Sequence, residues 1–142
     1  MVLHMIHIIE FPRIHDIRGN LTALESADNV PFTIQRVYYL YDVPGGAARG
    51  GHAHRTLEQV LVAITGSFEV VVDDGHGRCA LTLNRAYQGL YLPRMTWREL
   101  RNFSSGAVCL VLASEHFDPT DYIRDYETFR RLVGSPTPEI LD

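Results

Sequence analysis

Short segments in which apolar residues cluster or alternate between turn signals run through the middle of the chain. Segment 34–43 is rich in aromatic and β-branched residues and ends before Pro44, and segment 67–75 closes on an Asp-Gly turn. Such residues favour extended backbone, and Asp-Gly is typical of tight turns. Strands are predicted over 34–43, 58–66, 67–75, 79–84, 89–93 and 107–114. Six short strands at this spacing predict a β-sandwich or barrel.

The two ends of the chain depart from this pattern. Residues 16–25 predict a turn followed by a strand, and 29–33 a connector. Across 117–133 the apolar residues recur at helical spacing, with Asp118 as N-cap, Pro119 at N1 and Asp121 at N3. We therefore predict one all-β domain over 1–134 that a C-terminal α-helix closes, and an irregular tail over 135–142.

Length and charge narrow the class of protein. The 142 residues suit a single core, and a net charge of -4 argues against a nucleic-acid partner. All 13 basic residues are arginines, either through codon bias or because planar cations suit a ligand such as a diphosphate. Cys79 and Cys109 form no CxxC pair, and each lies within an apolar run, which predicts buried free thiols in a reducing compartment. With neither a signal peptide nor a membrane span predicted, we expect a cytoplasmic protein.

The segment 49–66, RGGHAHRTLEQVLVAITG, holds the candidate chemistry. In an extended strand His52 and His54 point to the same side, and Glu58 shares their side if no turn intervenes. Two histidines and a carboxylate in one cavity cost too much desolvation to be filler. They could transfer protons near neutral pH, or bind a metal as a two-histidine, one-carboxylate set. The residues alone leave both uses open.

The same segment resembles the first motif of the cupins, and four blocks together resemble the sugar 3,4-ketoisomerases that act on dTDP-4-keto-6-deoxyglucose. The blocks are RVYYLYDV, RGGHAHRTLEQVLVAITGSFEVVVDDG, GLYLPRMTWRELRNFS and VLASEHFDPTDYIRDYE, and the match runs from Ile9 to Phe129. The resemblance implies a cupin-type jelly-roll barrel, a homodimer and no cofactor. It also implies migration of a sugar ketone from C4 to C3 through an enediol, giving a dTDP-3-keto-6-deoxyhexose for deoxyamino-sugar biosynthesis.

The resemblance also assigns roles to residues. His52 would be the base at carbon and His54 the proton shuttle, although the reverse assignment stays open. Arg49 and Tyr39 would stabilise the enediolate or hold the diphosphate. The other substrate-binding residues it implies are Arg18, Glu58, Trp97 and Arg98. Arg18 and Arg98 would set the stereochemistry at C4, which this combination leaves open, and Trp97 either stacks on the ligand or packs in the core.

Two other classes of function stay in view. A metal-dependent cupin oxygenase would use His52, His54 and Glu58 as ligands, but Arg98 lies in the block where metal-binding cupins add a histidine, and a fixed cation repels a divalent metal. A non-catalytic sugar-binding cupin would use the same cavity without turnover.

Overall fold

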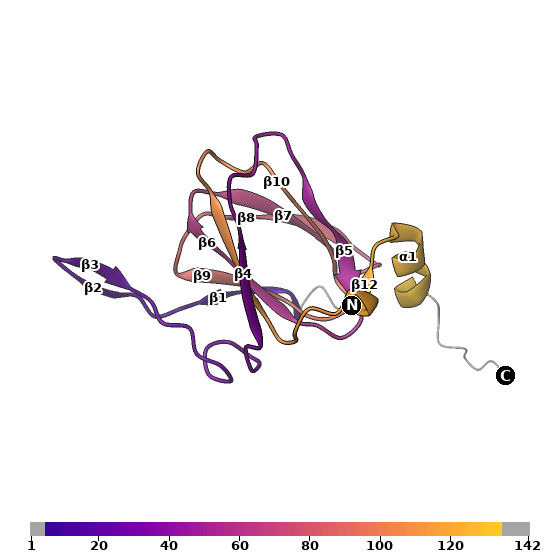
Figure 1. Ribbon diagram of the computed structural model, residues 1–142, viewed down its shortest axis with the longest axis horizontal. Coiled ribbons are helices and arrows are strands. Elements are labelled where there is room, and N and C mark those ends of the chain that lie inside the picture. Colours follow the sequence, from indigo (N-terminus) through magenta and orange to yellow (C-terminus); the bar gives the residue numbers. More distant parts are fainter. Residues whose placement is uncertain (1–4, 135–142) are drawn as a thin grey trace.

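Two five-stranded antiparallel sheets face each other and carry most of the chain (Figure 1). The computed structural model describes residues 5–134. The first sheet has the order β1-β9-β6-β11-β4, and the second has the order β12-β5-β10-β7-β8. The strands of the first are β1 (His7–Glu10), β9 (Gln88–Leu92), β6 (Gln59–Thr65), β11 (Val108–Ala113) and β4 (Arg36–Leu40). Those of the second are β12 (Tyr122–Ile123), β5 (Arg49–His54), β10 (Trp97–Arg101), β7 (Phe68–Asp73) and β8 (Arg78–Leu83).

The all-β class and the six predicted strands are confirmed, each strand within two residues of its predicted start. The predicted barrel is not closed, because within residues 5–134 no strand pair joins the two sheets. The molecule is a sandwich whose open side contains a cavity.

Alternation along the strands builds the core between the sheets. Phe68, Val70 and Val72 of β7 point inward and pack against Leu61 of β6 and Leu90 of β9. The outward side chains of β6, among them Val60 and Val62, are covered by a second apolar cluster that includes Phe11, Val30 and Phe32. Strand β6 is therefore buried on both faces, which explains its continuous apolar run.

A small hairpin extends away from both sheets (Figure 1). Strands β2 (Ile14–Asp16) and β3 (Gly19–Leu21) pair with each other and with no other strand of the described chain. The predicted turn before a strand at 16–25 is thus present, but the strand is short and its partner precedes the turn.

The C-terminal segment holds three elements where one helix was predicted. Asp118 caps a short 3-10 helix (η2, Pro119–Asp121), β12 then pairs with β5, and the α-helix α1 begins only at Tyr126 and ends at Gly134. The predicted helix start is wrong because Tyr122 and Ile123 add a strand to the second sheet. Asp125 takes the capping role, accepting a hydrogen bond from the backbone N–H of Thr128.

The prediction of an irregular tail falls on 135–142, outside the described residues, and the domain boundary at 134 stays a prediction. No helix of the described chain is long and apolar enough to span a membrane.

Candidate active site

A cavity of about 410 Å³ lies between the sheets where β4, β5 and β10 meet. This volume falls in the range of small-molecule sites. Its lining combines four arginines, two tyrosines, one histidine and one glutamine with small or aliphatic residues: Arg36, Tyr38, Leu40, Arg49, Gly50, Gly51, His52, Gln59, Leu61, Arg98, Leu100, Val111, Tyr122 and Arg124.

A β-bulge on β5 brings Arg49 and His52 to the same cavity. Arg98 of β10 pairs with His52, and Leu100 pairs with Arg49, so between these two pairs β5 has two residues where β10 has one. Gly50 lies in the bulge with a φ of +79°, which glycine adopts at little cost. In a regular strand, residues three positions apart, such as Arg49 and His52, point to opposite faces of the sheet, and the bulge brings them to the same face.

His52 and His54 share the inner face of β5, as predicted. Ala53 between them faces the opposite way and packs in the cluster that contains Trp97. The two imidazole rings meet edge to face with their centroids 4.8 Å apart. His52 lines the cavity, whereas His54 is 0% exposed, with its ring centroid 4.4 Å from that of Tyr122. His54 therefore lies directly behind the cavity wall.

Asp121 is a partner of His54 that the sequence analysis missed. The Nδ1 atom of His54 lies 3.1 Å from Oδ2 of Asp121. The carboxylate also accepts hydrogen bonds from the backbone N–H groups of Thr56 at 2.8 Å and Leu57 at 3.3 Å. Asp121 was interpreted as a helix-start residue, and no spacing links it to a histidine 67 positions earlier. The pairing arises because β12 brings the end of η2 beside β5.

Arg98 is a buried cation at the back of the cavity. It is 2% exposed, and its guanidinium donates hydrogen bonds to the carbonyl oxygen of Thr96 and the side-chain oxygen of Gln59. Gln59 in turn donates to the hydroxyl of Tyr38 at 3.0 Å. No carboxylate of the described chain forms an ion pair with Arg98. Burial lowers the pKa of Arg98 to about 10, so the side chain remains charged at neutral pH.

Both histidines are neutral bases at pH 7. Burial, with the nearby Arg98 cation second, lowers the pKa of His52 from 6.5 to about 2. The same two causes lower the pKa of His54 to about 4, against an opposing contribution from Asp121. The site thus places two uncharged proton acceptors in a positive electrostatic field.

Two further arginines at the cavity are held on aromatic rings. The guanidinium carbon of Arg124 lies 4.1 Å from the ring centroid of Tyr122, and that of Arg36 lies 5.0 Å from the ring centroid of Tyr38. Such stacking orders an arginine while its N–H donors stay free for an anion. Together with Arg49 and Arg98, they make the cavity suited to a ligand that carries negative charge.

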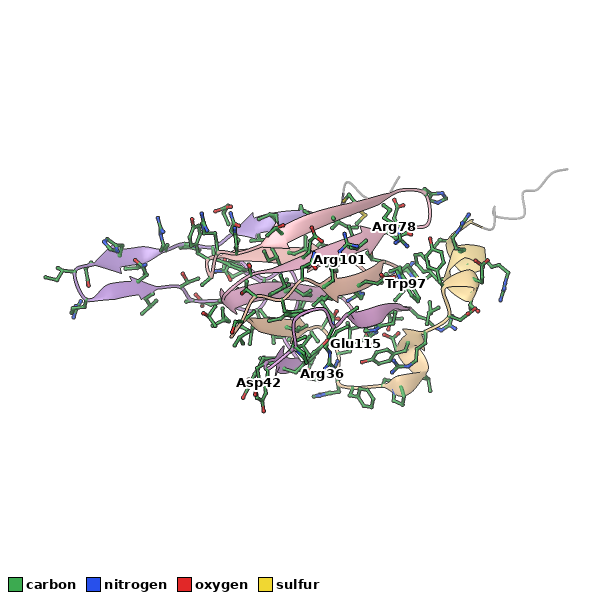
Figure 2. All side chains as sticks on the ribbon, turned by 90° about the horizontal axis from the view of Figure 1, so that it is seen from above. Arg36, Asp42, Arg78, Trp97, Arg101 and Glu115 are labelled. Carbon is green, nitrogen blue, oxygen red and sulfur yellow. The ribbon has the colours of Figure 1, made fainter. Side chains whose placement is uncertain are left out.

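Four residues predicted to bind substrate lie away from the cavity. Tyr39 points outward from β4 and is 59% exposed, so its neighbour Tyr38 lines the cavity instead. Trp97 occupies the outer face of β10 and packs against Phe129 of α1, as Figure 2 shows by its place beside the helix. It therefore packs in a core cluster, the second of its two expected roles.

Glu58 and Arg18 are the other two residues that lie away from the cavity. Because the chain turns between β5 and β6, Glu58 does not share the side of His52 and His54. Its carboxylate accepts a hydrogen bond from the hydroxyl of Tyr91 at 2.6 Å. His52, His54 and Glu58 consequently do not converge, and no cluster of three or more potential metal ligands occurs within residues 5–134. Arg18 lies on the β2–β3 hairpin, where it pairs with Asp16 and its side chain is 87% exposed.

Comparison with known proteins identifies relatives over almost the whole chain. A model of the protein family described as "FdtA: WxcM-like, C-terminal" matches residues 4–134. A curated protein of Aneurinibacillus thermoaerophilus, TDP-4-oxo-6-deoxy-alpha-D-glucose-3,4-oxoisomerase, is 47% identical over 127 residues, which make up 89% of this chain and 91% of that protein.

Solved structures agree with this match. A 3,4-ketoisomerase from Helicobacter canadensis has 46% sequence identity and a TM-score of 0.89, covering 92% of this chain and 98% of its own. A histidine-to-asparagine variant of QdtA, a 3,4-ketoisomerase from Thermoanaerobacterium thermosaccharolyticum, was solved in complex with TDP-4-keto-6-deoxyglucose. It has 37% identity and a TM-score of 0.90, covering 94% of this chain and 97% of its own.

Proposed function

The chain belongs to the FdtA family of sugar 3,4-ketoisomerases, and from this premise we propose how its own residues move the keto group of dTDP-4-keto-6-deoxyglucose from C4 to C3. The proposal rests on one observation: neutral imidazoles stand at and behind the wall of a cavity whose fixed charges are arginines. A carbon base needs a free lone pair, and the enediolate that it creates needs cations.

His52 is the carbon base in this proposal because it is the histidine that lines the cavity. It removes the proton at C3, which the C4 carbonyl acidifies, and leaves an enediolate with its charge on O4. His54 takes the proton of the O3 hydroxyl and gives it to O4. His52 then returns a proton to C4, which leaves the ketone at C3. Each histidine ends in the state in which it began.

In this proposal one arginine stabilises the enediolate that forms during the reaction, and the other three bind the diphosphate of the substrate. Arg98 is buried beside His52 in the paired strand and has no carboxylate partner among the described residues, so it is placed to stabilise the enediolate. Arg36, Arg49 and Arg124 line the same cavity and suit the diphosphate. Of the two arginines expected to set the stereochemistry at C4, only Arg98 reaches the cavity within one chain.

We also propose a homodimer that the β2–β3 hairpin helps to form. Three of its apolar side chains are exposed, Ile14 at 63%, Ile17 at 99% and Leu21 at 58%. A lone two-stranded hairpin is marginally stable in water, and a second copy would cover these side chains. It would also give Arg18 a route to a substrate. Sedimentation equilibrium should give twice the chain mass for the natural protein and a lower mass for Ile17→Asp. A monomeric natural protein contradicts the dimer.

The cysteines support a cytoplasmic location as part of the proposal. Both are free thiols; the prediction that both are buried is confirmed for Cys109 and wrong for Cys79, which is exposed. Thiols stay reduced in the cytoplasm, whereas secreted proteins tend to form disulfides. Determining the redox state of Cys79 and the cell fraction that contains the protein tests this point, and recovery from an oxidising compartment contradicts it.

Turnover in D₂O tests the activity. Incubation with dTDP-4-keto-6-deoxyglucose should give a 3-keto product with deuterium at C4, because His52 exchanges its proton with solvent, and NMR identifies both the position and the configuration at C4. The same product should form after treatment with a chelator, since the proposed steps use only side chains. Substrate that stays unchanged contradicts the activity, and loss of turnover with the chelator contradicts the metal-free mechanism.

A further inference from the structure

The contact between His54 and Asp121 fixes which nitrogen of His54 carries the proton. Although burial by itself raises the pKa of Asp121, hydrogen bonds from Thr56, Leu57 and His54 outweigh it and hold the pKa below its usual value of 3.8. The carboxylate is therefore ionised at neutral pH and can only accept hydrogen bonds. A neutral His54 facing it at 3.1 Å must carry its proton on Nδ1, which leaves Nε2 as the acceptor.

The second nitrogen of His54 is a buried acceptor that lacks a partner. Within the described chain, Nε2 has no hydrogen-bond partner and no access to solvent. The imidazole ring that carries it packs against the rings of His52 and Tyr122, both of which line the cavity. An unpaired buried acceptor is unfavourable, so such an atom beside a ligand cavity indicates a hydrogen donor that arrives with the ligand.

We propose that Asp121 is a positioning residue for the isomerisation: its carboxylate holds His54 as the Nδ1–H tautomer with Nε2 ready to accept a proton from the substrate. The role rests on the proposed function, in which His54 carries a proton between O3 and O4. When Nε2 takes the O3 proton, His54 becomes a cation, and Asp121 balances that charge until the proton passes to O4. No atom or charge is gained or lost over the cycle.

The way in which Asp121 is bonded makes its replacement by asparagine informative. One carboxylate oxygen accepts from the backbone N–H and the hydroxyl of Thr56, and the other accepts from His54 and the N–H of Leu57. Asparagine has a single oxygen. If that oxygen serves Thr56, the amide NH₂ faces His54 and donates to Nδ1, so the imidazole proton moves to Nε2 and the acceptor is lost.

Kinetics of Asp121→Asn should separate this role from a structural one. We expect kcat to fall by about 10²- to 10⁴-fold, the range for a misplaced acid–base group. KM should change by less than about threefold because Asp121 does not line the cavity. Asp125→Asn is the matched control, since Asp125 lies four residues away, caps α1 and contacts neither histidine. Its kcat should match that of the natural protein.

The tautomer of His54 can be determined without measuring activity. Long-range ¹H–¹⁵N spectra of histidine-labelled protein distinguish Nδ1–H from Nε2–H, and His54→Gln assigns the signal. We expect Nδ1–H for His54 in the natural protein, Nε2–H in Asp121→Asn and Nδ1–H again in Asp121→Glu. Asp121→Glu should also recover at least about tenfold of the lost kcat, because it retains the carboxylate.

Three results overturn the proposal: an Nε2–H tautomer in the natural protein, an unchanged kcat in Asp121→Asn, or equal losses in the asparagine and glutamate variants. The first needs only the natural protein, so it applies even if a variant fails to fold. Failure of the proposed function is a different result. In that case the natural protein makes no 3-keto sugar while the tautomers still follow residue 121 as expected.

Discussion

The space between the two sheets is apolar on one side and polar on the other. Where the neighbouring strands β7 and β8 of one sheet face β9 of the other, the inward side chains are apolar and include Phe68, Leu83 and Leu90. Where β4, β5 and β10 meet, the inward set includes His52 and Arg98. Side chains alternate along the strands on both sides, except where the bulge at Gly50 interrupts the alternation on β5. The comparison teaches that strand periodicity places side chains inward, whereas residue type decides whether they form a core or a cavity.

Substitution of one residue on each side should separate chemistry from stability. His52→Asn on the polar side should lower kcat by about 10²- to 10⁴-fold, as expected for loss of an acid–base group, and change the unfolding free energy by less than about 1 kcal/mol. Leu83→Ala on the apolar side is the matched change. It should cost about 3 kcal/mol of unfolding free energy, because Leu83 is fully buried, and leave the kcat of the folded protein unaltered. Steady-state kinetics measure kcat and urea unfolding measures the unfolding free energy of both variants. A loss of stability in His52→Asn together with a loss of kcat in folded Leu83→Ala would contradict the division into a polar and an apolar side.

Lowering the pH should reduce the unfolding free energy, because the polar side contains the buried, uncharged His54. The pKa of His54 is about 4 in the folded protein and about 6.5 when unfolded, so below pH 6.5 the unfolded chain binds more protons. The contribution of His54 to the unfolding free energy is fully present above pH 6.5 and is lost as the pH falls toward 4. At pH 5 the loss is about 2 kcal/mol for one buried imidazole.

Urea unfolding at pH 7.5 and pH 5 measures this difference. In His54→Gln the difference should shrink by about the same 2 kcal/mol, because glutamine does not titrate. A pH dependence identical to that of the natural protein would contradict the assignment of the effect to His54.

The sequence predicted the apolar side of the molecule better than the polar side. Most strands could be located from apolar content and turn residues, because packing selects those residues directly. On β4 the resemblance to the ketoisomerases assigned Tyr39 to the substrate, whereas the structure places its neighbour Tyr38 in the cavity. On β10 the resemblance assigned both Trp97 and Arg98, and of these two only Arg98 lines the cavity. An aromatic residue can be buried by another element, here α1 over Trp97, and strand spacing alone does not reveal which face that element covers.

Features that depend on contacts between distant segments escaped prediction. The apolar residues over 117–133 do recur at helical spacing, but only those from Tyr126 onward lie in α1. Tyr122 and Ile123 form β12 instead, because they pair with β5. Asp121 was visible as a residue, yet its contact with His54 exists only once that pairing forms. The pairing of His52 with His54 was predictable because both lie on one strand.

The return of segment 118–124 to the edge of β5 has a consequence for protein synthesis. A growing chain can assemble most of both sheets while His54 still lacks its carboxylate and the wall of Tyr122 and Arg124 is missing. The site therefore stays incomplete until segment 118–124 has been synthesised, because that segment supplies Asp121, Tyr122 and Arg124.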